Sequence, residues 1–233
     1  MNPTGPESSR DLEALSLVSL VCGRIAHDLN NVLAAIDGYS EFVAQEVTDQ
    51  PQVLADIGEV RSAARKGVAF SRRLRQVGQL LEGYPEVLDL SAVVTEAEEQ
   101  VRLAAADRVE IQLDLAAGLP TVKADRQQLR LALLSLVDNA CEAMPGGGTM
   151  SLKTFAIGEE VALQVADTGG GIPAELLDRI YDPFFSTKDK AIGNGLGLFI
   201  VEGVVRRAGG RAELLAGPRG GTTATLLLPA AGS

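Results

Sequence analysis

The chain has 233 residues, of which 46% are hydrophobic and 22% charged, which is typical of a folded protein and excludes a disordered or collagen-like one. Its 21 basic and 31 acidic residues give a net charge of −10, so its overall field does not favour nucleic acid or an anionic membrane. Aromatic residues make up 4% of the chain and none is tryptophan, so a platform for stacking nucleic-acid bases is not expected.

The N-terminus is polar and lacks the basic and apolar regions of a signal peptide. No apolar run reaches the ~20 residues of a membrane span. We therefore expect a cytoplasmic protein with no membrane span, and we expect residues 1–10, which contain two prolines, to form a disordered tail. Two cysteines, Cys22 and Cys141, fall in apolar helical patterns, where they are either inert core residues or redox-active thiols.

Apolar residues recur at intervals of three and four across residues 15–43, which predicts one face of a helix about eight turns long. The helix should end before Pro51, because proline disfavours helix in the residue that precedes it. A second apolar stripe covers residues 53–81. Residues 11–83 are therefore predicted to form a long antiparallel helical hairpin, and pairing with a second copy in a dimeric four-helix bundle would cover its apolar face.

The second predicted helix carries a run of basic residues with no acidic residue between them. They are Arg61, Arg65, Lys66, Arg72, Arg73 and Arg75. Such a run is either a solvated helix face or a docking site for an acidic partner or a nucleotide phosphate.

The chain changes character after the Glu-Gly-Tyr-Pro string that ends at Pro85, so we expect a second domain over residues 84–233. Strands are predicted at 87–90, 109–115, 149–156, 161–166, 211–215 and 222–228, with a short segment of unassigned type at 121–124. Helices are predicted at 91–106 (capped by Ser91), 125–144 (capped by Asp125), after Pro173, and from about 195 to 209. This mixture predicts an α/β layer with one sheet faced by helices.

Three features of this second domain point to a nucleotide. Asp167 and the glycines at 169–171 directly follow an apolar strand, which is either a turn or a site where a ligand approaches the backbone closely. The string from Gly193 to Leu198 opens a helix, whose N–H groups and dipole suit a phosphate. The lysine-containing segment before it is typical of a lid. Asn139, polar on an apolar helix face, is either a plain surface residue or a ligand of Mg²⁺ on a phosphate.

The chain has one histidine, His27, in the middle of the first predicted helix. The neighbouring Asp28 could fix its tautomer and raise the basicity of the other ring nitrogen, which would make the imidazole a nucleophile. Asn31 lies one helical turn further along the same face.

Taken together, these motifs resemble the catalytic core of bacterial two-component sensor histidine kinases over about residues 12–229. His27 to Asn31 resembles the family's phosphoacceptor box, and the segment from Asp125 through Asn139 to Gly148 resembles its asparagine box. Three further boxes, two glycine-rich and one phenylalanine-rich, are similar to residues 167–172, 193–198 and 182–188.

The resemblance implies a multidomain α and α/β (α+β) fold, in which a dimeric helical hairpin precedes an α/β sandwich of the histidine-kinase ATPase type. It implies ATP and Mg²⁺ as cofactors and autophosphorylation of His27, with Asp28 orienting the ring and Asn31 assisting dephosphorylation of a receiver domain. Asn139 would hold the metal, Asp167 the adenine, and Lys188 with the second glycine box the phosphates. The implied cofactor-binding residues are Asn139, Asp167, Gly169, Gly171, Ile172, Lys188, Gly193, Gly195, Leu196, Gly197, Leu198 and Thr223.

The implied partners are a second copy of the chain, the receiver domain of a response regulator, and a separate sensor or regulatory protein. No sensor domain is expected within these 233 residues, so the chain is either part of a longer kinase or an orphan kinase regulated in trans. Two positions depart from the family pattern, Ser135 in place of asparagine and Cys141 in place of arginine. Two alternatives stay open: a histidine phosphotransferase of the same fold that does not use ATP, and an ATPase or adaptor that forms no phosphohistidine.

Overall fold

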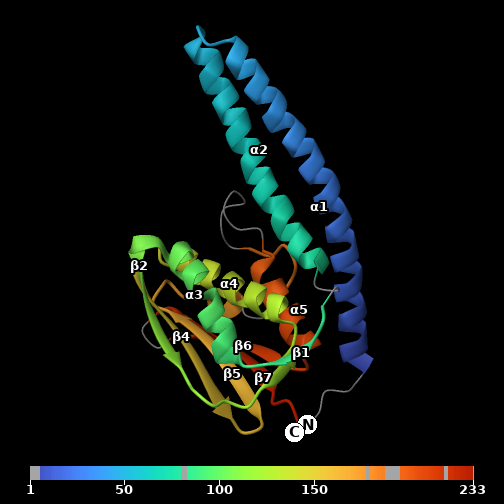
Figure 1. The fold of residues 1–233 in the computed structure, drawn as a ribbon, viewed down its shortest axis with the longest axis vertical. Helices are drawn as coiled ribbons and strands as arrows, with labels where there is room; N and C mark the ends of the chain where they lie inside the picture. Colours follow the sequence, from blue (N-terminus) through green and yellow to red (C-terminus); the bar gives the residue numbers. More distant parts are fainter. Residues whose placement is uncertain (1–5, 80–82, 177–178, 187–194, 218–219, 233) are drawn as a thin grey trace. The chain divides into compact units, whose positions relative to one another are not determined.

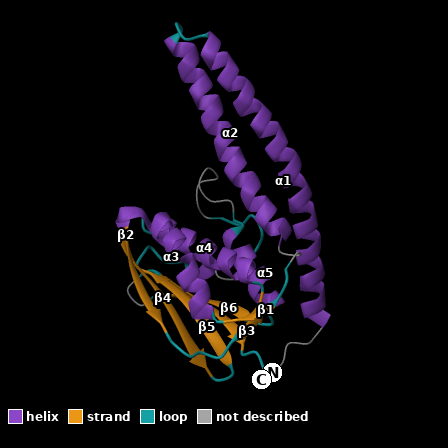
Figure 2. Ribbon diagram, in the orientation of Figure 1, coloured by secondary structure: helices purple, strands orange, loops and turns teal. Residues whose placement is uncertain are grey.

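The computed structural model describes residues 6–79, 83–176, 179–186, 195–217 and 220–232. Over these residues the chain separates between Glu82 and Gly83 into two compact units, a helical hairpin and an α/β domain (Figures 1 and 2).

The hairpin consists of two long helices, α1 (Pro6–Glu46) and α2 (Pro51–Gly78). Pro51 occupies the first turn of α2, where a missing N–H leaves no hydrogen bond broken. The helix α1 begins at Pro6, so residues 6–10 are helical, which differs from the disordered tail that we expected over residues 1–10. Proline at a helix start explains this difference, because its fixed φ angle suits the first helical position.

Small residues line the contact between α1 and α2. Ala26 is fully buried, and its carbonyl accepts a hydrogen bond of 2.7 Å from the buried hydroxyl of Ser71. Where Gly23 and Gly78 face each other, a Cβ on Gly78 would lie 2.6 Å from the Cα of Gly23. The two helices can approach this closely only because Gly78 carries no side chain.

The hairpin also leaves a stripe of large apolar side chains exposed. These are Leu17, Leu20, Val21, Ile25, Val32, Ile36, Tyr39, Phe42 and Val43 on α1 and Val60 on α2. Contiguous apolar surface of this kind is unusual on a soluble monomer and marks an interaction site.

The α/β domain contains seven strands and three α-helices among its described residues. The strands are β1 (Glu86–Leu88), β2 (Val109–Leu115), β3 (Val122–Ala124), β4 (Gly148–Ile157), β5 (Glu160–Asp167), β6 (Arg211–Ala216) and β7 (Thr222–Pro229). The helices are α3 (Leu90–Ala105), α4 (Arg126–Ala143) and α5 (Gly197–Arg207), with 3₁₀ turns at Ala106–Arg108 and Ala174–Leu176.

Five strands form one sheet in the order β2-β4-β5-β7-β6, in which only the β2–β4 pair is parallel. The helices α3, α4 and α5 cover one face of this sheet (Figure 2). Fully buried residues such as Leu133, Met150 and Leu163 fill the layer between them. A separate pair, β1 with β3, runs antiparallel beside the start of α4 (Figure 1). The predicted fold class, a helical hairpin followed by an α/β layer, is confirmed.

Two helix starts show what local sequence can and cannot decide. Asp125 caps α4 as predicted, because its Oδ1 accepts the backbone N–H of Gln128 at 2.9 Å. The prediction for α3 was wrong by two residues: Asp89, and not Ser91, is its cap, and it accepts the N–H of Ser91 at 2.8 Å. Leu90, which we placed in a strand, is the first residue of α3 and is fully buried.

Candidate functional site

The end of β5 holds a carboxylate that is positioned by backbone groups. Asp167 is the last residue of β5, and its Oδ1 accepts N–H donors from Gly169 at 2.8 Å and from Thr222 at 3.2 Å. The second donor comes from the start of β7, which pairs with β5. Hydrogen bonds to the charged form stabilise it, so Asp167 is presented as an oriented carboxylate at the edge of the sheet.

Glycines let three backbone segments meet around Asp167. A Cβ on Gly169 would lie 2.5 Å from the carbonyl oxygen of Ala143, the last residue of α4. Gly221 has φ +82°, and a Cβ there would lie 2.0 Å from the carbonyl oxygen of Asp167. Side chains at these positions would separate the end of α4, the loop after β5 and the start of β7, so the site depends on the glycines.

The predicted metal ligand lies beside the second glycine cluster. Asn139 is on α4, and a Cβ on Gly197, the first residue of α5, would lie 3.4 Å from its Nδ2 and 3.5 Å from its Oδ1. The N-cap residue of α5 is Leu196, whose own side chain makes no capping hydrogen bond. A helix start of this kind presents backbone N–H groups and a positive partial charge to an anion. The structure thus brings Asn139 together with the helix start that the sequence assigned to phosphate.

The second glycine cluster is also tied to the phenylalanine pair. Gly195 has φ +64°, and a Cβ there would lie 2.4 Å from the carbonyl carbon of Phe184. The N–H of Phe184 donates to the carbonyl of Gly195 at 3.0 Å. Phe184 itself has φ +67°, a region that bulky side chains rarely adopt, and its side chain is 54% exposed. An aromatic side chain held in this way needs its surroundings to maintain the conformation.

The remaining predicted cofactor-binding residues differ in burial, and two of them lie outside the described residues. Lys188 and Gly193 lie outside the described residues. Leu196 is fully buried, so only its backbone could contact a nucleotide, whereas Gly171, Ile172 and Leu198 are half-buried. Thr223 lies within β7 opposite Ala166.

The Gly-Thr-Thr string at residues 221–223 fits the usual ending of the family, but a cofactor-binding role was predicted only for Thr223. The structure instead shows that the N–H of Thr222 reaches Asp167 and that Gly221 lies against the backbone of Asp167.

The predicted phosphoacceptor lies on the hairpin. His27 Nδ1 is 3.2 Å from Asp28 Oδ1, and the two side chains are 71% and 76% exposed. Asn31 is also exposed on α1. Because Ala26, the preceding residue, is buried against α2, the packing of the hairpin directs the ring of His27 to solvent.

The basic run on α2 is partly neutralised by α1. Arg61 Nε lies 3.1 Å from Asp37 Oδ1, and the same guanidinium also pairs with Glu41. Hydrogen bonds to Asp37, more than any other interaction, raise the pKa of Arg61. For Arg61 the function is therefore structural, whereas Lys66, Arg72 and Arg75 remain exposed.

Comparisons with known proteins identify the family. Residues 124–232 match the family described as histidine kinase-, DNA gyrase B-, and HSP90-like ATPase. Over 232 residues the chain is 32% identical to the sensor kinase CckA of Brucella abortus (strain 2308), covering 93% of this chain and 25% of CckA. It is 30% identical to the solved histidine kinase domain of the E. coli osmosensor EnvZ, covering 64% of this chain and 92% of that domain with a TM-score of 0.50. The chain belongs to the sensor histidine kinases.

The likeness to kinases extends over both units. The alignment with the full-length structure of ShkA covers 91% of this chain and 46% of ShkA, with a TM-score of 0.71 and 23% identity. This likeness supports the fold alone. The chain spans between a quarter and about half of the length of the first curated relatives it matches. The predicted kinase family and its ATP-binding domain are thereby confirmed. Among the described helices of this kinase, none is both long and apolar enough to cross a membrane.

The two departures from the family pattern lie on α4. Ser135 is half-buried. At Cys141, burial first and the charge of Asp138 second raise the pKa of the thiol, so the side chain stays neutral near pH 7. A neutral thiol does not carry the positive charge of an arginine, so Cys141 differs from the family pattern in charge.

Proposed function

We propose that this kinase transfers the γ-phosphoryl group of ATP to His27 and then to an aspartate on the receiver domain of a response regulator. The observation that carries the proposal is the exposed contact of 3.2 Å between His27 Nδ1 and Asp28 Oδ1. Donation of the Nδ1–H to the carboxylate leaves the lone pair on Nε2, which faces outward as a nucleophile. Membership of the histidine kinases supports this assignment.

The two transfer steps need no reactant other than ATP and the carboxylate of the receiver. The Nε2 lone pair forms a bond to the γ-phosphorus while the bond from that phosphorus to the bridging oxygen breaks, and ADP leaves with the electron pair. The positive charge that develops on the imidazole is stabilised by the Asp28 carboxylate. In the second step the nitrogen–phosphorus bond breaks as a receiver carboxylate oxygen takes the phosphoryl group.

The site in the α/β domain fits ATP because it offers separate groups for the adenine, for the phosphates and for the metal ion. Asp167 would accept a hydrogen bond from the adenine amino group, and its two backbone donors hold it ready to do so. The backbone N–H groups at the start of α5 would bind the phosphates. Asn139 would hold Mg²⁺, which neutralises phosphate charge when it is bound. Gly169, Gly171, Gly195 and Gly197, together with the backbone of Leu196, would let the nucleotide approach the main chain.

The exposed apolar stripe on the hairpin supports a homodimer, because a second copy would bury it in a four-helix bundle. Asn31, exposed and one helical turn from His27, would orient a water molecule for dephosphorylation of a docked receiver. We also propose a separate sensor protein as the source of the signal, and a cytoplasmic location for the kinase core.

Labelling with γ-labelled ATP tests the proposal. The wild-type chain should take up label that is labile in acid and stable in base, the behaviour of a phosphorylated histidine. Because the sequence contains one histidine, any phosphohistidine must be at position 27. His27→Gln should bind ATP with unchanged affinity and take up no label, since a glutamine amide is not a nucleophile. Label that persists in the variant would show that the acceptor lies elsewhere.

A histidine phosphotransferase of the same fold is the alternative, and calorimetry separates the two. The kinase should bind ATP, and a phosphotransferase with a degenerate pocket should not. The retained glycines at the closest backbone contacts favour the kinase.

A further inference from the structure

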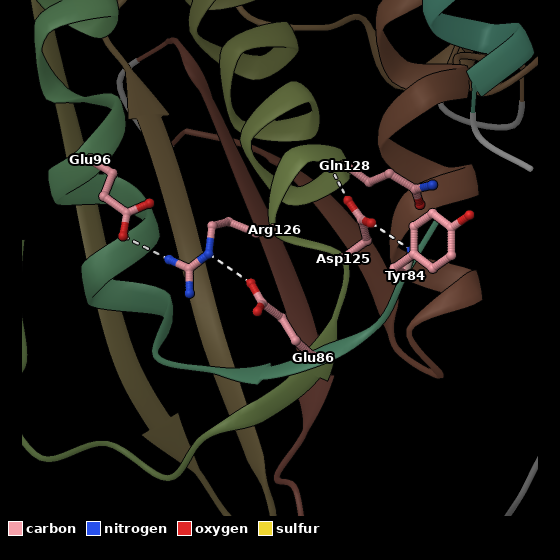
Figure 3. Close-up of polar contacts among 6 residues, drawn as sticks. All are labelled: Tyr84, Glu86, Glu96, Asp125, Arg126 and Gln128. Carbon is pink, nitrogen blue, oxygen red and sulfur yellow. Dashed lines mark hydrogen bonds and ion pairs between the residues drawn. The ribbon is translucent and has the colours of Figure 1, made fainter. Parts of the chain in front are cut away.

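A single carboxylate joins the start of the α/β domain to the helix α4. Asp125 Oδ1 accepts the N–H of Gln128 and caps α4, while its Oδ2 accepts the N–H of Tyr84 at 2.7 Å (Figure 3). Tyr84 is the second residue after the boundary between the two units. The two oxygens of one side chain therefore hold a helix start and the first residues of the domain at the same time. The ring of Tyr84 is 87% exposed, so the contact is made by the backbone.

Packing around this carboxylate leaves little room for the chain to move. A Cβ on Gly83 would lie 2.5 Å from Nε2 of Gln128, a residue that is 8% exposed. Glu86, two residues after Tyr84, pairs in the β1–β3 ladder with Ala124, the residue directly before Asp125. Residues 83–88 are thus attached to the start of α4 by side-chain, packing and strand contacts.

Arg126 adds a second connection on the same helix turn. Its guanidinium donates to Glu86 on β1 and to Glu96 on α3, each at 2.7 Å (Figure 3). These hydrogen bonds, the one to Glu86 first, raise the pKa of Arg126. The partners are half exposed, and ion pairs of this kind contribute little to stability. Of the side-chain connections between residues 83–88 and the first turn of α4, we therefore take the bond from Tyr84 N–H to Asp125 as the stronger.

The helix that begins at this contact also carries the nucleotide chemistry. Asn139 lies on α4, and Ala143 at its end meets Gly169 in the loop after Asp167. We propose that Asp125 is a positioning residue: its second oxygen holds residues 83–88 to α4, so that they move as one body with the nucleotide site. This rests on the proposed phosphoryl transfer: a looser start of the domain would lower the rate at which bound ATP reacts with His27.

Asp125→Asn separates the two hydrogen bonds that the carboxylate accepts, one from Gln128 and one from Tyr84. Asparagine is as good a helix cap as aspartate, so the bond to Gln128 and the start of α4 are kept. The amide nitrogen cannot accept a hydrogen bond, so the N–H of Tyr84 loses its acceptor. We expect hydrogen exchange at the Tyr84 amide, followed by NMR on the full chain, to become at least tenfold faster. We expect kcat for labelling of His27 to fall at least threefold while KM for ATP stays within twofold.

Two further variants make the test specific. Tyr84→Pro removes the donor and leaves Asp125 intact, so it should reproduce the split between kcat and KM. Asp89→Asn makes the same chemical change at the cap of α3, where the carboxylate accepts Ser91 N–H at 2.8 Å. This control should leave exchange at Tyr84 and both kinetic constants unchanged.

Three results would overturn the proposal: an unprotected Tyr84 amide in the wild type, a freed amide with unchanged kcat, or an equal loss of kcat in Asp89→Asn. A rise in KM together with a lower melting temperature would also contradict it, because that pattern indicates general damage to the domain. Absence of label in the wild type would instead refute the proposed function, and exchange at Tyr84 would still decide whether Asp125 holds the chain.

Discussion

At the scale of single residues, aspartates at the ends of elements carry much of the local order. Asp89 and Asp125 accept N–H groups at helix starts, and Asp167 accepts two at the end of a strand. Each supplies a hydrogen-bond acceptor to backbone N–H groups at the end of a helix or strand. The same chemistry builds two helix caps and the proposed adenine contact.

Asp167→Asn should weaken ATP binding by about ten- to a hundredfold, because a hydrogen bond to a charged group is worth about 1.5–3 kcal/mol. The amide can keep one acceptor for Gly169 and Thr222 but presents the wrong group to adenine. Calorimetry with the full chain measures the affinity, and circular dichroism checks the fold. Unchanged affinity in a folded variant would exclude Asp167 from the nucleotide site.

Asn31→Ala should separate two activities of the same helix face. Labelling of His27 and forward transfer should stay within a few-fold of wild type, because both depend on the imidazole and Asp28. Dephosphorylation of a receiver that accepts phosphoryl from this kinase should slow about tenfold or more, the lower range for one positioning group. Rates of all three steps, measured on purified proteins, give the comparison. If labelling falls first, Asn31 serves the kinase step.

At the scale of elements, small residues decide how closely helices and strands approach. Gly23 and Gly78 set the contact of α1 with α2, and Gly169 sets the contact of the loop after β5 with α4. Each contact joins residues far apart in the sequence, so the distances depend on neighbours that a local pattern does not contain. Glycine within a helix lowers stability relative to alanine, because it loses more backbone conformational freedom on folding. Replacing it by alanine therefore tests whether a close contact requires the missing side chain.

Gly78→Ala should destabilise the hairpin by about 1–3 kcal/mol, because its Cβ would overlap Gly23 and force the helices apart. Gly58→Ala is the matched control on α2, where a Cβ meets nothing within 4 Å. It should stabilise the helix by about 0.5–1 kcal/mol. Thermal unfolding followed by circular dichroism at 222 nm measures both. Equal effects of the two variants would mean that the close contact does not limit the hairpin.

At the scale of the whole molecule, the apolar stripe on α1 stays exposed in a single chain. Burial of apolar surface contributes about 25 cal/mol per Å², so a second copy is the natural way to cover it. The structure decides which apolar residues of α1 face outward. Ala26 and Cys22 face α2, whereas Val32 and Ile36 are exposed.

Val32→Glu should shift the chain from dimer to monomer in sedimentation velocity, because an unpaired carboxylate would be buried in the interface. Val32 is 57% exposed in the single chain, so the monomer should stay folded. Gln45→Glu adds the same charge at an exposed position of α1 and should leave the dimer intact. Nucleotide affinity should be unchanged in both. A chain that sediments as a monomer before substitution would refute the proposed dimer.

Much of the fold could be predicted because its signals are local. The strand β2 has the bounds that its alternating residues predicted, and α4 begins after Asp125 as its cap predicted. The start of α3 was missed because Val87 to Leu90 is a short apolar run, and such a run does not distinguish a strand from the first turn of a helix. The short helix expected after Pro173 is present as a 3₁₀ turn at Ala174–Leu176.

By itself, the sequence determined the two domains' element types, the family motifs and the chemical character of the candidate residues. It did so because periodicity, caps and motif spacing involve residues close together along the chain. Only the tertiary structure decided that Thr222 donates to Asp167, that Gly197 borders Asn139, and that the N–H of Tyr84 reaches Asp125. These contacts join residues 41 and 55 positions apart in the two hydrogen-bonded cases, and strand pairing and helix packing bring them together.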